Sequence, residues 1–199
     1  IRGEPQENKI RVIHVLCPVN EKLQKDWCTV QYEDLRAAKL IMGPFMSKMD
    51  LKQGYRNVPV VEGDRKFLCF SWRGKIFQTN VLPFGLASAP RAFTEILIGL
   101  GAKWRLQGAW VIIYLDDIFI SGDTFDSWRE AVKLVYEDLS EAGLRVNVKK
   151  LFVGPFQKIE FLGAVLDHEN QVITVSDKKV AKAMKMISEF KEEPRSIEK

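Results

Sequence analysis

The chain has 199 residues, of which 46% are hydrophobic, and its 30 basic and 26 acidic side chains give a formal net charge of +4 at pH 7. This composition excludes a disordered tail and predicts a globular protein of one large or two small domains, whose mildly basic balance permits a nucleic acid partner. No apolar run approaches the roughly 18 residues of a membrane span, and residues 1–15 lack a signal-peptide layout. Three widely spaced cysteines favour a reducing, intracellular setting, either cytoplasm or nucleus. Because the first residue is Ile1, we expect a piece of a longer chain.

Strand-like and helix-like stretches alternate along the sequence without repeats or Gly/Ser linkers, which predicts one continuous α+β unit. In the first half, residues 9–16 predict a strand, 32–41 a helix, and 45–50 a strand that ends on an acidic residue. Residues 65–72 and 75–82 flank Arg73-Gly74 and predict a hairpin.

Two longer stretches, 89–106 and 126–142, have apolar residues three or four positions apart, which predicts a helix with one buried face in each. Ser88 and Gly143 stand where an N-terminal and a C-terminal cap are expected. The expected buried residues are Phe93, Ile96, Leu97, Leu100, Trp128, Val132, Val135 and Leu139. Further strands are expected at 145–148, 158–166 and 171–175, before a basic helix from Ser176 to about Phe190.

Two adjacent acidic residues interrupt the apolar run VIIYLDDIFISG at 111–122. Residues 110–114 and 118–120 alternate as two short strands, so Asp116 and Asp117 fall at or near the turn between them. Ionised carboxylates in apolar surroundings are unfavourable unless a metal or a partner compensates them. Asp-Asp at a hairpin turn is also common for structural reasons, so the pair alone leaves both roles open.

Other elements in a fixed order strengthen the functional interpretation. Asp50 ends an apolar strand, Tyr55 stands five residues later, LPFGLASAPRAF lies between the two acidic sites, and KIEFLG follows them. With these motifs, the sequence resembles the fingers and palm of reverse transcriptases of the retrotransposon and retroviral kind, from about Lys9 to Asp167. The stretch FSWRGKIFQTNVLPFGLASAPRAFT is most similar to the DIRS-like retrotransposons, which integrate with a tyrosine recombinase.

The resemblance implies a polymerase palm, an antiparallel sheet backed by helices, with partial fingers and the start of a thumb. The ranges it implies are partial fingers at 1–46, the first catalytic palm segment at 47–60, a fingers hairpin and return at 61–85, the rest of the palm with the YLDD hairpin and primer-grip-like strands at 86–167, and the start of the thumb at 168–199.

The resemblance also implies the catalytic residues Asp50, Asp116 and Asp117, with Lys150 as the proton donor to pyrophosphate or a contact of the triphosphate. Nucleotidyl transfer uses two Mg²⁺ ions about 3.5–4 Å apart, and hard cations prefer oxygen ligands. Mn²⁺ is an expected substitute. Asp50 and Asp116 are expected to bridge the ions, and the carbonyl of Leu51 to add a ligand. Asp117 is the weaker companion, because neighbouring strand residues tend to face opposite sides.

By the same likeness, Tyr55 is the steric gate that excludes a 2′-hydroxyl, Phe84 contacts the incoming nucleotide, and Gly85 lets the backbone approach the template. Arg11, nine residues before Asn20, matches the arginine that contacts the triphosphate. Each residue also has a structural interpretation: Tyr55 as an aromatic core residue, LPFG as a loop that begins a helix, and Arg11 as an exposed strand charge.

Nucleic acid contacts are expected from Tyr114 and from the primer-grip-like Phe161, Leu162 and Gly163. Four basic residues are expected to follow the backbone of a template-primer duplex: Arg65, Lys66, Arg73 and Lys75. The implied partners are an RNA or DNA template with its primer, dNTPs, and other polyprotein domains such as RNase H, recombinase or integrase. No membrane partner is expected.

The N-terminal part departs from the family pattern, because Val15 and Cys17 stand where an Asp and an Arg are usual. Their joint loss is either a neutral apolar replacement of a buried ion pair or the mark of a copy without activity. Three hypotheses follow: an active RNA- and DNA-templated DNA polymerase, a catalytically inactive polymerase-derived scaffold, and another palm enzyme such as an RNA-dependent RNA polymerase or a nucleotidyl cyclase. Tyr55 and LPFG argue against the third.

Overall fold

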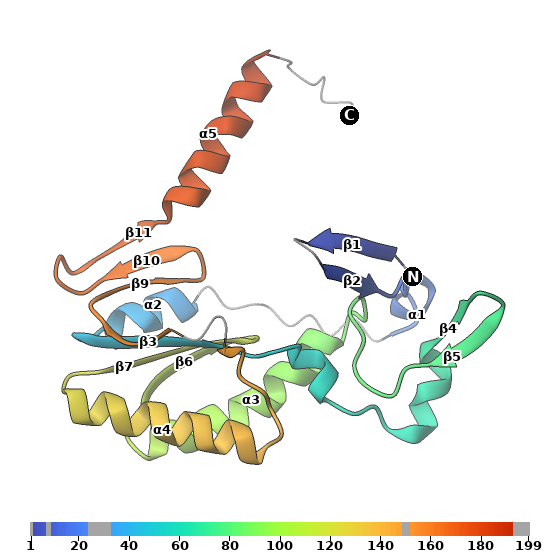
Figure 1. The fold of residues 1–199 in the computed structure, drawn as a ribbon, viewed down its shortest axis with the longest axis horizontal. Coiled ribbons are helices and arrows are strands. Elements are labelled where there is room, and N and C mark those ends of the chain that lie inside the picture. Colours follow the sequence, from blue (N-terminus) through green and yellow to red (C-terminus); the bar gives the residue numbers. More distant parts are fainter. Residues whose placement is uncertain (1, 7–8, 24–32, 149–151, 193–199) are drawn as a thin grey trace.

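A four-stranded antiparallel sheet forms the centre of the protein in the computed structural model, which describes residues 2–6, 9–23, 33–148 and 152–192 (Figure 1). The strand order is β6-β7-β3-β8. The four strands are β3 (Phe45–Asp50), β6 (Trp110–Tyr114), β7 (Asp117–Gly122) and β8 (Phe152–Phe156). Helices α3 (Ala89–Leu106) and α4 (Phe125–Glu141) cover one face. This arrangement agrees with the predicted α+β fold.

The second face of the sheet carries α2 (Glu33–Leu40) and a smaller three-stranded sheet. Its strands, in the order β11-β10-β9, are β9 (Lys158–Phe161), β10 (Ala164–Asp167) and β11 (Val172–Val175). Alternate residues of β7 separate the two cores: Ile118 and Ile120 pack under α3 and α4, whereas Phe119 packs with Phe161 on the opposite side. The central strands are therefore apolar on both faces.

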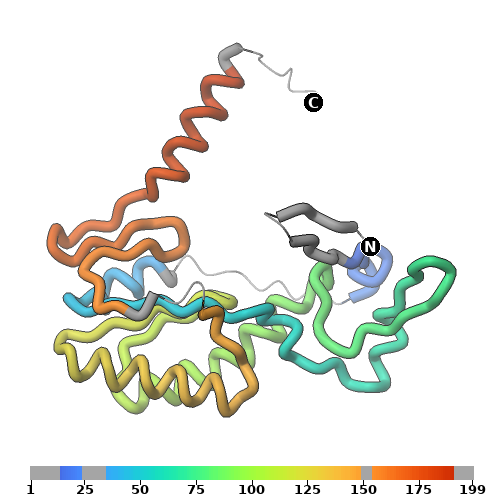
Figure 2. Tube along the Cα trace, in the orientation of Figure 1, coloured from blue at the N-terminus to red at the C-terminus, as the bar shows by residue number. Residues whose placement is uncertain are grey.

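Between β3 and α3 the chain leaves the sheet and returns to it, as Figure 2 shows. This excursion holds two 3₁₀ segments, η1 (Gly54–Asn57) and η2 (Glu62–Leu68), and the hairpin of β4 (Cys69–Trp72) and β5 (Lys75–Gln78). The same end of the molecule carries the paired strands β1 (Arg2–Gln6) and β2 (Lys9–Ile13) and the short helix α1 (Cys17–Asn20).

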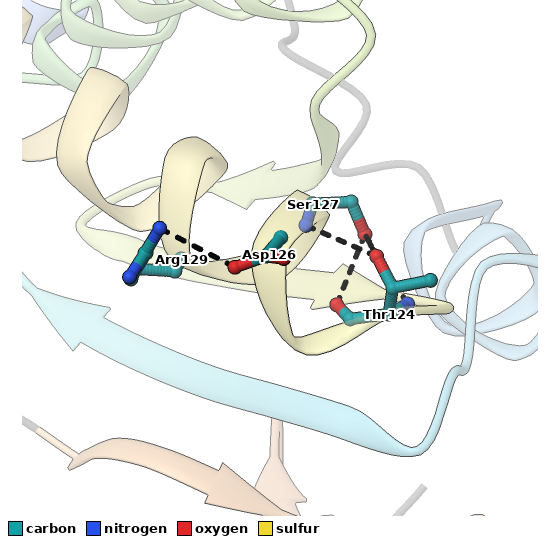
Figure 3. Close-up of polar contacts among 4 residues, drawn as sticks. All are labelled: Thr124, Asp126, Ser127 and Arg129. Carbon is teal, nitrogen blue, oxygen red and sulfur yellow. Dashed lines mark hydrogen bonds and ion pairs between the residues drawn. The ribbon is translucent and has the colours of Figure 1, made fainter.

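Helix α4 begins one residue earlier than expected because Thr124 caps it (Figure 3). The Ser127 N–H donates to Thr124 Oγ1 at 3.1 Å, and the Thr124 N–H donates to Ser127 Oγ at 3.3 Å. Asp126 and Arg129 add an exposed ion pair at 3.3 Å. The predicted end at Gly143 is confirmed, since its φ is +74° and the Leu144 N–H donates to the Leu139 carbonyl. Trp128 of α4 donates its indole N–H to Ser47 Oγ of β3.

Helix α5 (Asp177–Glu192) extends away from β11 (Figure 1). Its apolar side chains include Val180, Met184 and Ile187, which are exposed. Within the part of the chain that the structure describes, no helix has both the length and the apolarity needed to cross a membrane.

Several sequence expectations about strands were wrong, each for a local reason. Residues 145–148 form only an isolated bridge, Leu51 to Val146, and 158–166 is divided at Leu162 and Gly163, whose φ values of +51° and +71° make a turn between β9 and β10. The strand expected at 65–72 begins only at Cys69, because η2 occupies the preceding residues.

Strands β1 and β8 and helix α1 were not predicted. Pro5 in β1 and Gly154-Pro155 in β8 interrupt the patterns by which strands are recognised. In α3, Ser88 occupies the N-cap position without a side-chain cap bond, and Ile96 is 42% exposed. The buried stripe of α3 includes Phe93 and Leu97, as expected, and continues through Gly101 and Trp104.

Candidate active site at the ends of β3 and β7

Asp50 and Asp117 lie directly opposite each other, where β3 ends and β7 begins. Register partners in an antiparallel pair face the same side of the sheet, so both side chains belong to the side that carries β9. Asp116 and Leu115 are the two turn residues between β6 and β7, since Tyr114 pairs with Asp117. Leu115 has a φ of +52°. The turn therefore brings Asp116 beside the pair that Asp50 and Asp117 form.

Main-chain bonds fix Asp116 and Asp50 relative to each other. The Leu51 N–H donates to the Asp116 carbonyl at 2.8 Å, and the Asn147 N–H donates to the Asp50 carbonyl at 2.7 Å. The Asp50 side chain is 8% exposed, and its Oδ1 accepts a 3.0 Å bond from Asn147 Nδ2. Asn147 is a candidate site residue that sequence reasoning missed. Its position in RVNV was assigned to a strand, and only the bridge between Leu51 and Val146 brings it to Asp50.

The donor chemistry of this cluster suits a hard divalent cation. Asp116 is exposed and Asp117 is half-buried. The side chains of the three aspartates offer a metal ion only carboxylate oxygens as ligand atoms. Among the described residues, no three histidine, cysteine, aspartate or glutamate side chains converge in a geometry that would hold a metal ion by themselves. The strand ends therefore place the three aspartates close enough to suit Mg²⁺, but their carboxylates would have to turn toward the ion to bind it.

Tyr55 lies in η1, which follows β3 without a long connection. Its ring contacts Phe84 at a centroid distance of 5.3 Å and Phe93 at 5.4 Å. Gly54 makes this approach possible, because a Cβ there would lie 2.7 Å from the Phe93 ring. The structure thus brings Tyr55 and Phe84 together, and both are half-buried.

A side chain from α1 holds the loop that follows Phe84. Asn20 Nδ2 donates to the Gly85 carbonyl at 2.8 Å, and Asn20 Oδ1 accepts from the Ala87 N–H at 2.9 Å. Gly85 has a φ of +102°, a conformation that favours glycine. The His14 N–H donates to the Phe84 carbonyl at 3.1 Å. Burial lowers the pKa of His14 below its ordinary value of 6.5, and the charge of Arg56 lowers it further.

The primer-grip-like segment divides between core and surface. The ring of Phe161 is fully buried against Phe119 at 5.4 Å, so its side chain cannot contact nucleic acid in this structure. Leu162 and Gly163 form the turn, and Lys179 Nζ donates to the Leu162 carbonyl at 3.1 Å. Tyr114 is half-buried at the end of β6 and packs with the core that includes Phe161.

The remaining candidates lie in β2, around α1 and in the segment of η2 and the β4–β5 hairpin, or outside the described residues. Arg11 is in β2, opposite Glu4. Lys150 lies outside the described residues. Val15 is 51% exposed and Cys17 is also exposed, so the interpretation that they replace a buried ion pair was wrong. Of the four basic residues expected along a duplex, Lys66, Arg73 and Lys75 are exposed, while Arg65 donates to the Val60 carbonyl at 2.8 Å.

The family described as "Reverse transcriptase (RNA-dependent DNA polymerase)" matches residues 7–166. The chain is 31% identical to the Pro-Pol polyprotein of Feline foamy virus over 136 residues, which are 68% of this chain and 11% of that protein. It is 28% identical to the retrovirus-related Pol polyprotein from transposon opus of Drosophila melanogaster over 140 residues, which are 69% of this chain and 14% of that protein.

Among solved structures, a foamy viral protease-reverse transcriptase in complex with double-stranded DNA superposes with a TM-score of 0.79 at 22% identity. The match covers 90% of this chain and 31% of that chain. This likeness confirms the predicted fold, a polymerase palm with part of the fingers and the start of the thumb. The chain spans less than a third of each of these relatives.

Proposed function

Because the chain belongs to the reverse transcriptase (RNA-dependent DNA polymerase) family, we propose that it performs template-directed DNA synthesis from dNTPs within a retroelement polyprotein. One observation carries the proposal: Asp50 and Asp117 are register partners, and the Leu51 N–H bond to the Asp116 carbonyl holds the third acid beside them. Three carboxylates on neighbouring strand ends repel one another when they turn toward one point, so a cation between them is the natural compensation.

In this proposal Asp50, Asp116 and Asp117 hold two Mg²⁺ ions, and the Leu51 carbonyl adds a ligand. When bound, the ions would lower the pKa of the primer 3′-hydroxyl and compensate the charge of the triphosphate. Mn²⁺ would be able to replace Mg²⁺. Asp50 and Asp116 would be the principal residues that hold the ions. The Asp117 side chain faces the same side of the sheet as that of Asp50. This supports a stronger role for Asp117 in metal binding than the sequence predicts. Asn147 orients the Asp50 carboxylate through its 3.0 Å bond.

We further propose that Tyr55 selects deoxynucleotides. A ring supported on two sides by Phe84 and Phe93 is a rigid wall, and a rigid wall excludes an added 2′-hydroxyl better than a mobile side chain does. Phe84 contacts the nucleotide and Gly85 admits the template. Arg11 and Lys150 contact the triphosphate and leaving pyrophosphate in the same scheme.

The division of the chain and its partners are proposed on the same basis. The fingers comprise 1–46 and 61–85, the palm 47–60 and 86–167, and the thumb begins at 168. The primer strand lies near Tyr114, Leu162 and Gly163 in this proposal. Phe161 is left out of the predicted contact because its side chain is buried. RNase H, recombinase or integrase domains accompany the chain in its polyprotein. A DIRS-like subgroup is proposed from FSWRGKIFQTNVLPFGLASAPRAFT alone.

A primer-extension assay tests the proposal, with an RNA template, a DNA primer, Mg²⁺ and dNTPs. Asp116→Asn should lower extension by about 10³-fold or more, because the neutral amide loses most of its attraction for the cation. Asp126→Asn is the matched control: that carboxylate is 76% exposed on α4 and should leave extension unchanged. No extension by the unmutated chain in its full polyprotein would overturn the proposal.

A second candidate function is an inactive polymerase-derived scaffold. The observation that favours it is the exposed Val15 and Cys17, which leave two positions at the α1 end without the charges of the family pattern. A scaffold would bind a template-primer duplex with the same affinity in the presence and absence of Mg²⁺ and would extend no primer. Mg²⁺-dependent extension excludes it.

A further inference from the structure

One face of the β4–β5 hairpin carries a row of aromatic rings. The register pairs Phe70 with Phe77 and Trp72 with Lys75, and strand alternation places these four side chains on one face. The other face carries Cys69, Ser71, Ile76 and Gln78. The hairpin projects from the end of the molecule that also holds β1, β2 and α1 (Figure 1).

The rings on this face form a stack that begins at His14. The His14 and Phe70 centroids are 4.8 Å apart at an interplanar angle of 30°, and those of Phe70 and Phe77 are 5.6 Å apart at 19°. Trp72 continues the row toward the turn, and the Arg73 guanidinium lies 5.8 Å from its ring centroid. Trp72 is 54% exposed and Phe77 is 43% exposed. The row thus ends at the exposed rings of Trp72 and Phe77, which lie beside basic side chains.

The charges of the hairpin favour a polyanion as the occupant. Residues 69–78, CFSWRGKIFQ, contain two cations and no acidic residue. Exposed aromatic rings interleaved with basic side chains bind single-stranded nucleic acid, because any base can stack on a ring while the cations attract the phosphates. Both cations, Arg73 and Lys75, are exposed next to Trp72.

The stack is also joined to the candidate nucleotide site. His14, its first ring, donates its main-chain N–H to the Phe84 carbonyl at 3.1 Å. A strand that left the site past Phe84 and Gly85 would meet His14 and then the hairpin face. We propose that Phe77, Trp72 and Lys75 form a stacking platform for unpaired nucleotides of the template ahead of the site. The position along the template rests on the proposed function, whereas the stacking itself does not.

Direct binding tests the platform without any synthesis. The probes are a labelled primer-template with a single-stranded 5′ template overhang and a blunt duplex of the same paired length, measured by fluorescence anisotropy in EDTA without dNTPs. Trp72→Ala should weaken binding of the overhang probe about tenfold, the order expected for one lost base-stacking contact, and change binding of the blunt probe less than about twofold. Trp72→Phe should recover most of the loss, because it keeps a flat ring.

Ile76→Ala is the matched control, since Ile76 is 80% exposed on the same hairpin but on the opposite face. It should leave both affinities unchanged. Lys75→Ala should reduce the salt dependence of overhang binding by about one unit of log–log slope. These three positions are exposed, and circular dichroism of each variant checks that the fold is intact.

Equal losses for the two probes, or an equal loss in Ile76→Ala, would overturn the proposal. If Trp72→Ala changes the sedimentation of the chain and leaves overhang binding intact, the face is a protein interface instead. Overhang binding that depends on Trp72 in a chain that extends no primer would leave the platform standing while the proposed polymerase function fails.

Discussion

Asn147 bonds to Asp50 twice, once through its main-chain N–H to the Asp50 carbonyl and once through its side chain to Asp50 Oδ1, at 2.7 and 3.0 Å. The two bonds lock the segment after α4 onto the end of β3. They also fix the rotation of a carboxylate that is only 8% exposed. A residue that orients a metal ligand in this way affects metal affinity without touching the substrate.

Asn147→Ala should therefore raise the Mg²⁺ concentration needed for half-maximal primer extension about 10–100-fold, with the maximal rate less affected at saturating Mg²⁺. Asn57→Ala serves as control, because within the described part of the chain the Asn57 amide donates to the main-chain carbonyls of residues 52–54 and to no carboxylate. A lower rate at every Mg²⁺ concentration with an unchanged midpoint would contradict the positioning role. Thermal unfolding of both variants separates this effect from loss of fold.

Tyr55→Ala should reduce the preference for dNTPs over rNTPs about 10²-fold, because removal of the ring opens space for a 2′-hydroxyl. The ratio of kcat/KM for the two nucleotides measures the preference. Tyr55→Phe keeps the ring against Phe84 and Phe93 and should therefore retain the preference for dNTPs. If all three proteins discriminate equally, Tyr55 is a packing residue only.

Asn20→Ala should raise the KM for dNTP about tenfold and leave kcat within about twofold, because two bonds that order the loop at Gly85 and Ala87 are lost. Asn20→Asp keeps the acceptor for the Ala87 N–H and loses the donor to the Gly85 carbonyl. Its KM should therefore lie between those of the unmutated chain and Asn20→Ala. Steady-state single-nucleotide insertion measures both constants. A fall in kcat with unchanged KM would place Asn20 in the chemical step.

The parts of the site that could be predicted from sequence are those set by local pattern. Asp50 ends an apolar strand, and Asp116 and Asp117 interrupt a pair of short strands, so the strand ends and the turn were readable. The pairing of Asp50 with Asp117 depends on the register of β3 against β7. Register is fixed by packing on both faces of the sheet, which a single sequence does not reveal.

What escaped prediction depends on contacts between distant segments. Asn147 meets Asp50 across 97 positions, and Asn20 meets Gly85 across 65. Asp138 was also missed, because the sequence gives no sign that a charged residue of α4 is buried. Its partners Lys103 and Trp104 come from α3, more than 30 positions earlier.

Asp138 links α3 to α4 under the sheet. Its two oxygens accept from Trp104 Nε1 at 2.8 Å and from Lys103 Nζ at 2.9 Å, and the bond from Lys103 holds its pKa below the ordinary value. Asp138→Ala leaves the buried indole N–H without its acceptor and should lower the free energy of unfolding by about 2 kcal/mol. Glu137→Ala, which breaks only an exposed 3.8 Å ion pair, should change it by less than about 0.5 kcal/mol. Urea denaturation compares them, and equal values would refute the assignment.

Asp167 should make the β9–β11 unit sensitive to acid. Hydrogen bonds from the Asn170 side chain and N–H, with the Lys158 ammonium at 3.2 Å, lower the pKa of Asp167 from 3.8 to about 2. Because the folded pKa is the lower one, the stabilising effect is fully present well above pH 3.8 and is lost as the pH falls toward 2. Asp167→Asn should destabilise the protein at pH 6 and flatten the stability curve below pH 4.

Urea denaturation at a series of pH values between 6 and about 2.5 measures this effect, since that interval spans most of the change between the two pKa values. Glu169→Gln, an exposed acid two positions away, provides the control and should leave the shape of the curve unchanged. Hydrogen exchange at the amides of β10 and β11 should accelerate in Asp167→Asn more than exchange in β3 and β7, because the bonds that the substitution weakens close the turn between β10 and β11. Parallel curves for the mutant and the unmutated chain would show that Asp167 titrates alike in the folded and unfolded states and that its bonds to Asn170 add no pH-dependent stability.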